Sequence, residues 1–360
     1  MAKKIILPGL IDVHTHMRTP GQTQKEDFYT GTLSALNGGF TTIIDMPNNA
    51  VPITTKKLLD EKIKIAKSQT VCDIGFHFGS LGNNLEEFEK ISDRVFGLKL
   101  YLNQTTGGFI IGKKELESIC AAWKSKQPIL LHAEEDMLEM VFKIIKKTNK
   151  KIHICHVSSE TELSKIAKAK EKGLQITCGV TPHHLFLNSF DEKKLGAFGK
   201  MKPYLKSKKD VKFLWDNFEY IDIIESDHAP HTVQEKKSES PFGVPGLDTT
   251  LPLLLFAMEE GKISIDEIIR LCHTNPSIIF NIPTDKKTSV EIFMEEYILS
   301  KKDLKTKCGW SPFEGRRVIG KVSKVLIRGS KVFENGKCLV KPGGGRIIFP
   351  TERNVPANFQ

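Results

Sequence analysis

Short apolar runs alternate with longer amphipathic segments along most of the chain. The runs have the length and composition of buried β-strands, and they lie at residues 10–16, 41–48, 71–79, 95–102, 128–134, 151–157, 174–180 and 220–227. Apolar positions recur at helical spacing in residues 26–37, 55–68, 112–125, 135–148, 158–172 and 207–218. Eight strands alternating with helices predict an α/β fold, a parallel (β/α)8 barrel of the TIM type, with reactive side chains at the carboxyl ends of the strands.

The pattern changes in the last part of the chain. Residues 316–337, RRVIGKVSKVLIRGSKVFENGK, alternate apolar and polar positions and contain an Asn335-Gly336 turn. This pattern predicts short antiparallel strands. We expect them to form a small β appendage with the first few residues of the chain. The predicted division is a barrel over residues 8–307 and an appendage made of residues 1–7 and 308–360.

The composition is that of a soluble globular protein, with 39% hydrophobic and 27% charged residues and no apolar run that could span a membrane. Seven scattered cysteines without CxxC spacing indicate reduced thiols, so we expect a cytoplasmic protein. The net charge of +10 comes from lysines spread along helical segments beside glutamates. No basic patch with interleaved aromatic residues is visible, which argues against nucleic-acid binding and leaves an anionic small substrate compatible with the charge.

Histidines and one aspartate stand where four predicted strands end. His14 and His16 are two residues apart, so both imidazoles leave the same face of the first strand. Their alternative interpretation is a pair of polar core residues, which is uncommon without a ligand. His132, His156 and Asp227 end three further strands, and each alone is more often a core or capping residue. Because the carboxyl ends of barrel strands meet at one face, the set predicts a hydrolytic metal centre.

The sixth strand leaves an alternative open. His153 and Cys155 share one of its faces, whereas Ile154 and His156 share the other. Spacing alone does not choose between them, although the more terminal position favours His156.

Lys99 lies in the middle of the apolar run VFGLKLYLNQ, residues 95–104. Alternation turns Lys99 toward the barrel interior, where an unpaired ammonium is costly. Next to two divalent cations its pKa would fall, and the neutral amine would react with carbon dioxide to give a carbamate, an anionic ligand. An ion-paired or snorkelling lysine is the alternative, and spacing alone does not separate the two.

Nine motifs in fixed order resemble those of the amidohydrolase superfamily and, within it, the dihydroorotases. From residue 7 to about residue 255 they are LPGLIDVHTHMRTPG, KEDF, GGFTTIIDMPN, GLKLYLN, LLHAE, HICHV, TPHHLFL, SDHAPHT and VPGLDTTLPLLL, with a weaker echo at WSPFEG, residues 310–315. The lysine in GLKLYLN makes the likeness greatest to the dihydroorotase domain of the multifunctional animal pyrimidine protein and its stand-alone relatives.

The resemblance implies a zinc-dependent cyclic amide hydrolase. Its reaction would be the reversible cyclisation of N-carbamoyl-L-aspartate to L-dihydroorotate with loss of water, in de novo pyrimidine (UMP) biosynthesis. The implied cofactors are two Zn²⁺ ions, or other divalent metals, bridged by hydroxide and by a CO2-derived carbamate on Lys99. His14 and His16 would bind the more buried metal with Asp227, which would also be the proton shuttle. The more exposed metal would be bound by His132 and His156.

The resemblance also implies substrate contacts. Arg18 and Asn48 would hold the substrate carboxylate, helped by His231. Pro245 and Gly246 look like the backbone that contacts the pyrimidine ring. A guanidinium binds a carboxylate bidentately, so these residues favour an anionic substrate.

Two positions depart from the family pattern, and two others belong to a predicted lid. Lys202 stands where relatives often carry an arginine, and it keeps the charge but loses the fork. Gly179 stands where close relatives have a glutamate that can serve a third zinc with Cys155, so the sequence predicts a two-metal site with Cys155 as a buried thiol. Thr105 and Thr106 match a loop that closes over substrate in relatives.

Two other functions compete with this interpretation. Another cyclic amidase, a hydantoinase, dihydropyrimidinase or allantoinase, would share the metal ligands, but Arg18 and Asn48 argue against it. Some dihydroorotase-like chains have lost their ligands and are scaffolds for aspartate transcarbamoylase. Here all six metal-site positions carry competent residues, which favours catalysis. As partners we expect the small-molecule substrate, a second copy of the chain in a homodimer, and an additional association with aspartate transcarbamoylase.

Overall fold

The computed structural model describes residues 3–105 and 110–351 of the chain. Its central strands are β2 (Leu10–Thr15), β3 (Phe40–Asp45), β4 (Asp73–Phe76), β5 (Phe78–Gly79), β6 (Leu98–Tyr101), β7 (Ile129–His132), β8 (Ile152–Ile154), β9 (Ile176–Val180) and β10 (Ile223–Ile224). They pair in parallel in chain order, and β5 resumes the strand that β4 begins. A bridge between Thr15, at the end of β2, and His228, in the segment after β10, closes the ring. The predicted (β/α)8 barrel is confirmed.

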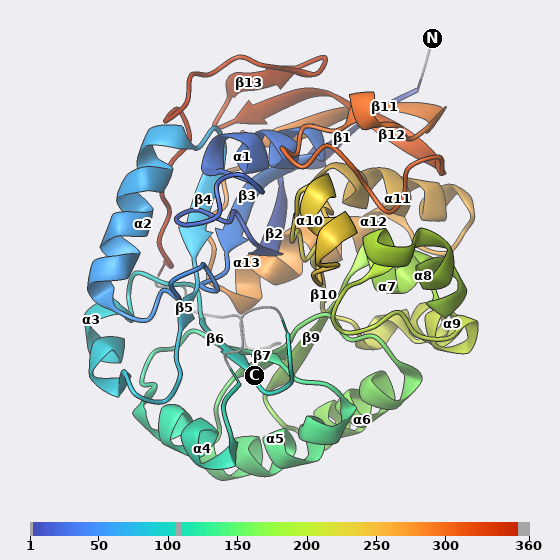
Figure 1. Ribbon diagram of the computed structural model, residues 1–360. Coiled ribbons are helices and arrows are strands. Elements are labelled where there is room, and N and C mark those ends of the chain that lie inside the picture. The colour runs from blue at the N-terminus through green and yellow to red at the C-terminus, as the bar shows by residue number, and fades with distance from the viewer. Residues whose placement is uncertain (1–2, 106–109, 352–360) are drawn as a thin grey trace.

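Helices surround the barrel, as Figure 1 shows. The longer ones are α1 (Phe28–Asn37), α2 (Lys56–Gln69), α4 (Lys113–Ala122), α5 (Glu135–Thr148), α6 (Glu160–Glu171), α9 (Lys208–Asp216) and α11 (Leu247–Glu259). The shorter ones are α3 (Phe88–Ile91), α7 (Pro182–Phe186), α8 (Ser189–Leu195), α10 (Val233–Ser238), α12 (Ile265–Ile269) and α13 (Asn275–Ile279). Within the described residues no helix has both the length and the apolarity needed to cross a membrane.

A second, antiparallel sheet forms the appendage beside α1 and α11 (Figure 1). Its strand order is β1 (Lys4–Pro8), β11 (Ser289–Ile298), β12 (Arg317–Ile327), β13 (Ser330–Glu334) and β14 (Lys337–Cys338). Asn335 and Gly336 both have positive φ, 47° and 79°, as a tight hairpin turn requires. The C-terminal part of the sheet begins with β11, before the predicted boundary at residue 308. Its N-terminal strand ends at Pro8, one residue after the predicted boundary at residue 7. The first half of β11 alternates buried and half-buried residues because one face packs on the molecule.

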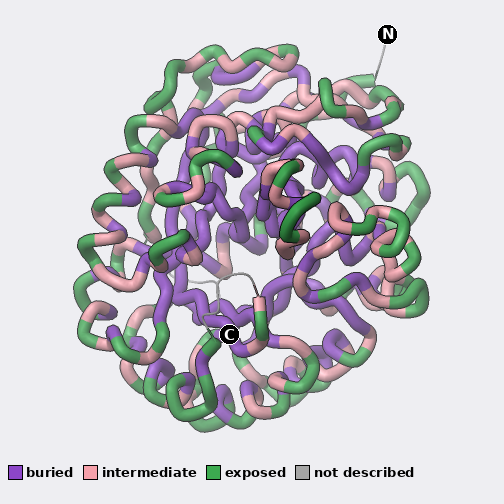
Figure 2. Tube along the Cα trace, in the orientation of Figure 1, coloured by how far each residue is buried: buried purple, intermediate pink, exposed green. Residues whose placement is uncertain are grey.

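The apolar core has two parts that leave the barrel mouth to polar residues. The larger part lies between the strands and the surrounding helices, and Figure 2 shows this buried ring. A smaller cluster fills the lower barrel interior and includes Ile11, Val13, Phe96, Leu130 and Phe280. The interior is therefore a packed core rather than a pore, and its charged side chains gather toward the carboxyl ends of the strands.

Candidate active site

A cavity of about 390 Å³, counted with its open mouth, lies at the carboxyl ends of the barrel strands. Most of the site residues predicted from the sequence line it, namely His14, His16, Arg18, Asn48, Thr105, His132, His156, Lys202 and Asp227. Tyr101, Ala229, Phe242 and Gly243 complete the lining. Thr106, the other residue of the predicted lid, lies outside the described residues.

Imidazole and carboxylate donors meet in the deepest part of this cavity. One donor atom each from His14, His156 and Asp227 lies within 4.8 Å of the other two. The Asp227 Oδ1 atom is 3.2 Å from His14 Nε2 and 3.0 Å from His16 Nε2, and His132 Nδ1 is 3.0 Å from His156 Nε2. His132 Nε2 and His156 Nδ1 are buried without a hydrogen-bond partner. Unpartnered imidazole nitrogens beside a buried carboxylate fit a divalent metal, for which this donor set is typical.

Left-handed backbone conformations aim two of these side chains. His156 and Asp227 have φ values of 42° and 44°, which residues other than glycine rarely adopt. Because β8 ends at Ile154, strict alternation no longer applies at His156. Cys155 packs inside the barrel and His156 lines the cavity. Both residues therefore point inward, so the sequence-based choice between the Cys155 face and the His156 face does not arise. Such strain is commonly found at functional sites.

Lys99 on β6 points into the barrel interior beneath the cavity, as alternation predicts. It is 1% exposed, and its Nζ atom lies 3.0 Å from Cys155 Sγ and 5.0 Å from the centre of the Tyr101 ring. Among the described residues no carboxylate forms an ion pair with Lys99. The ion-paired alternative is therefore not seen among the residues that the structure describes.

Glu225 is a site residue that the sequence analysis missed. It is completely buried, its Oε2 atom lies 3.1 Å from His14 Nδ1, and its Oε1 atom accepts a hydrogen bond from the backbone N–H of His156. Although burial alone would raise its pKa, His14 and His153 hold the pKa of the Glu225 carboxyl well below its usual range. The signal was present in ESD, because Glu225 and Asp227 stand at alternate positions of one strand end.

Gly179 makes room for this carboxylate. A Cβ atom at Gly179 would lie 2.6 Å from the carboxyl carbon of Glu225, closer than real Cβ atoms approach. A longer side chain at position 179 and a buried Glu225 in this conformation therefore exclude each other.

The two histidines of the first strand differ in charge preference. Burial and Lys99 oppose protonation of His14, but the carboxylates of Glu225 and Asp227 outweigh them and raise its pKa to about 10. Burial lowers the pKa of His16 to about 4, against the attraction of Asp227. Asp227 itself has a pKa held below its usual range by His14 and His16, although burial acts in the opposite direction. A neutral His16 beside an ionised Asp227 suits metal binding, which requires deprotonated ligands.

A cationic side chain faces the same cavity. Arg18 is buried, its Nε atom donates to Pro230 O at 3.1 Å, and its Nη2 atom lies 3.2 Å from His231 Nε2. In the described part of the chain no carboxylate forms an ion pair with this guanidinium. Asn48 Oδ1 lies 2.7 Å from His16 Nδ1, which leaves the amide Nδ2 of Asn48 as a donor.

The remaining predicted contacts lie around the rim or behind the wall. Lys202 lines the cavity, 3.9 Å from a carboxylate oxygen of Glu134. Pro245 and Gly246 do not line it, and Gly246 N donates instead to His228 Nδ1 at 3.2 Å.

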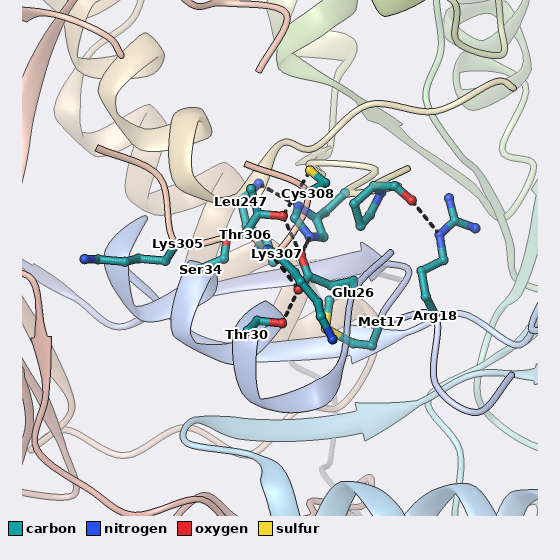
Figure 3. Close-up of polar contacts among 12 residues, drawn as sticks. Met17, Arg18, Glu26, Thr30, Ser34, Leu247, Lys305, Thr306, Lys307 and Cys308 are labelled. Atoms are coloured by element: carbon teal, nitrogen blue, oxygen red, sulfur yellow. Dashed lines mark hydrogen bonds and ion pairs between the residues drawn. The ribbon is translucent and has the colours of Figure 1, made fainter. Parts of the chain in front are cut away.

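The other ring nitrogen of His228, Nε2, contacts the KEDF motif. His228 Nε2 lies 3.2 Å from Glu26 Oε2, and Glu26 also accepts hydrogen bonds from Thr306 Oγ1 and Lys307 N. Figure 3 shows Thr306 and Lys307 reaching Glu26, with Arg18 nearby. This buried carboxylate joins the segment after β11 to the cavity wall, a contact that the sequence analysis did not foresee.

Comparisons with known proteins agree with this geometry. The amidohydrolase family model matches residues 5–184. The chain is 35% identical to a dihydroorotase of Pyrococcus furiosus, over 96% of this chain and 85% of that protein. It is 41% identical to the multifunctional protein CAD of Squalus acanthias over 98% of this chain, but it spans only 16% of that protein's length. An L-hydantoinase from Arthrobacter aurescens has the same fold, with a TM-score of 0.89, 23% identity, and coverage of 96% of this chain and 89% of that one.

A barrel with imidazole and carboxylate donors at the strand ends defines a metal-dependent hydrolase of the amidohydrolase type. The chain belongs to the amidohydrolase family and, within it, to the dihydroorotases.

Proposed function

We propose that this protein is a dihydroorotase, which interconverts N-carbamoyl-L-aspartate and L-dihydroorotate in pyrimidine biosynthesis. The observation that carries the proposal is Arg18, a buried guanidinium with no ion-pair partner among the described residues, in the same cavity as the metal-type donors. A buried unpaired charge is costly, so a carboxylate ligand would gain strongly from pairing with it. Both substrates carry a carboxylate, whereas a simple hydantoin or dihydropyrimidine does not.

The residues fit two divalent cations, with zinc as the first expectation. His14, His16 and Asp227 would hold one, and His132 and His156 the other. When bound, such ions polarise the scissile carbonyl and lower the pKa of a water molecule. The Lys99 amine lies beneath these donors, 3.0 Å from Sγ of Cys155, the residue that precedes His156. A carbamate on Lys99 would give both groups a shared anionic ligand.

The chain's own side chains would orient the substrate and move the proton. Arg18, with Asn48 Nδ2, would fix the carboxylate and so set the position of the ring amide. Asp227 would take the proton of the attacking water during ring opening and give it to the leaving nitrogen. Ring closure reverses the same steps, because both directions share one transition state.

A substrate panel tests the proposal. Purified protein assayed with dihydroorotate, dihydrouracil and allantoin should hydrolyse dihydroorotate about 10- to 100-fold faster than the neutral cyclic amides, in line with one charge-assisted contact. Hydrolysis of dihydrouracil with no activity on dihydroorotate would identify another cyclic amidase. Full-length protein that lacks metal and all three activities but binds aspartate transcarbamoylase would identify a scaffold.

We also propose a homodimer and an association with aspartate transcarbamoylase, which rest on the resemblance, and a cytoplasmic location, which rests on the scattered cysteines. Sedimentation of the protein alone and mixed with the transcarbamoylase tests the two assemblies. A monomer in the first run would contradict the homodimer, and two proteins that sediment independently in the mixed run would contradict the association.

A further inference from the structure

Two aromatic rings attract the ammonium of Lys202 at the rim of the cavity. The Lys202 Nζ atom lies 3.8 Å from the centre of the Tyr204 ring and 5.5 Å from the centre of the Phe242 ring. The two rings meet edge to face, with their centres 5.7 Å apart and an angle of 81° between their planes. Both distances from the ammonium lie within the range in which an aromatic face attracts a cation. The rings therefore restrict a side chain that would otherwise move freely at the rim.

The same ammonium remains able to bind a ligand. Among the residues that the structure describes, the carboxylate nearest to Lys202 Nζ is that of Glu134, at 3.9 Å, which is beyond hydrogen-bond distance. An aromatic face attracts the positive charge without a conventional hydrogen-bond acceptor, so the N–H groups stay available. Lys202 and Phe242 both line the cavity. A cation with available donors thus stands at the wall of the proposed substrate site.

A buried lysine fixes the backbone on which this arrangement is built. Lys236 on α10 is completely buried. Its Nζ atom donates to three backbone oxygens, those of Lys200 at 3.1 Å, Pro241 at 2.8 Å and Gly243 at 3.0 Å. These bonds join both neighbours of Phe242 to the segment that leads into Lys202. The positions of the ring and of the lysine backbone are therefore set together.

We propose that Tyr204 and Phe242 are positioning residues, which hold the Lys202 ammonium where it binds an oxygen atom of the substrate. The inference rests on the proposed function. A lysine has a flexible stem and lacks the planar fork of arginine, so it loses more freedom for each hydrogen bond that it forms. Rings that restrict the ammonium before the substrate binds remove part of that loss. The aromatic pair thus compensates for a lysine at a position where relatives often carry an arginine.

A double-mutant cycle in the steady-state hydrolysis of dihydroorotate tests this assignment. Tyr204→Leu should raise KM by about 3- to 10-fold with kcat unchanged, because a contact made in substrate binding is weakened. Tyr204→Phe keeps the aromatic face, so its KM should stay within about twofold of that of the unmodified protein. In a Lys202→Met background, Tyr204→Leu should have no further effect, since Tyr204 acts through the ammonium.

Phe190 on α8 provides the matched control. It is an exposed ring with two lysine ammonium groups nearby, those of Lys193 at 5.8 Å and Lys208 at 5.7 Å, and it does not line the cavity. Phe190→Leu should leave both KM and kcat unchanged. An equal rise of KM in Phe190→Leu and Tyr204→Leu would show a general effect of losing a surface ring, which would overturn the assignment.

Nuclear magnetic resonance tests the contact without any activity. An aromatic face shifts protons above it upfield, so isotope-labelled lysine should give an upfield ε-methylene signal that Lys202→Arg removes. The signal should survive in Tyr204→Phe and return to the ordinary position in Tyr204→Leu.

An additive cycle, a fall in kcat with unchanged KM, or the lack of an upfield Lys202 signal would overturn the positioning role. Dihydroorotate hydrolysis with an additive cycle refutes the positioning role only. Protein that shows the upfield signal but hydrolyses another cyclic amide instead of dihydroorotate refutes the proposed function only, and the cycle is then measured with that amide.

Discussion

Glu225 in the barrel and Glu291 in the appendage sheet both have a carboxyl pKa below the ordinary value, but their surroundings differ. Glu225 is fully enclosed and contacts His14 Nδ1 at 3.1 Å. Glu291 lies near the surface between β1 and β12, with its two oxygens 2.9 Å from the Nζ atoms of Lys4 and Lys324. Hydrogen bonds with Lys4, Lys324 and Ser323 lower the pKa of Glu291 to about 2.

The two carboxylates differ in whether water can replace a lost partner. Around Glu225 the protein has replaced all hydration, so removing one partner would leave an uncompensated buried charge. Around Glu291 water can replace either lysine, so the same kind of contact contributes little to stability. Charged side chains in the barrel are thus explained by the groups that they bind or by catalysis. Those in the appendage contribute solubility and small gains in stability. Substitutions in the two regions should therefore differ in both size and kind of effect.

The largest expected effect is at Asp227, the proposed proton shuttle. Asp227→Asn should lower kcat by about 10³-fold or more, equivalent to about 4 kcal/mol of activation free energy, because an amide cannot accept the proton. Steady-state dihydroorotate hydrolysis measures the loss. Asp216→Asn on α9 is the control, since Asp216 forms only an exposed ion pair with Lys212 and should leave kcat unchanged. A loss below about tenfold at Asp227 would contradict the assigned role.

Helix α2 offers the same comparison for stability. Lys62 is buried, and its Nζ atom lies 2.8 Å from Asp45 Oδ2 and donates to Met46 O. Lys62→Met should lower the free energy of unfolding by about 3–5 kcal/mol, because Asp45 is left as an unpaired buried carboxylate. Lys56→Met on the same helix removes an exposed pair with Asp60 and should cost less than about 0.5 kcal/mol. Urea denaturation of both variants measures the difference, and similar losses would refute the contrast.

The elements were predictable from the sequence because alternation and helical spacing directly reflect which side is buried. Residues at strand ends followed from the same logic, since a barrel brings all carboxyl ends to one face. The connection of Glu225 with His14 was not predictable, because a carboxylate near a strand end has the same pattern whether it caps, pairs or binds metal. The inward turn of His156 was also hidden, since a left-handed residue breaks the alternation that the prediction uses. The start of the appendage at β11 was not predictable either, because a strand can be assigned to a sheet only when the strand that it pairs with is known.

Arg18 should affect substrate choice more than turnover. Arg18→Met should lower kcat/KM for dihydroorotate by about 10- to 100-fold, because one charge-assisted contact with the substrate carboxylate is lost. The kcat/KM of Arg18→Lys should lie between those of the unmodified protein and Arg18→Met, since lysine retains the charge but cannot bind a carboxylate bidentately. Any residual hydrolysis of dihydrouracil, which has no carboxylate, is the internal control and should not fall. An equal loss for both substrates would show that Arg18 acts on the fold of the cavity instead.

The smallest expected effect is at Glu291. Its folded-state pKa of about 2 lies below the ordinary value of 4.5, so its contribution to stability is present above pH 4.5 and is lost as the pH falls toward 2. Glu291→Gln should therefore lower the free energy of unfolding by about 0.5 kcal/mol at pH 7 in low salt, and by less in 1 M salt or at pH 3. Urea denaturation under these three conditions measures it. A loss above about 2 kcal/mol, independent of salt, would show that this pair behaves like the buried pairs of the barrel, and the distinction between the two regions would then fail.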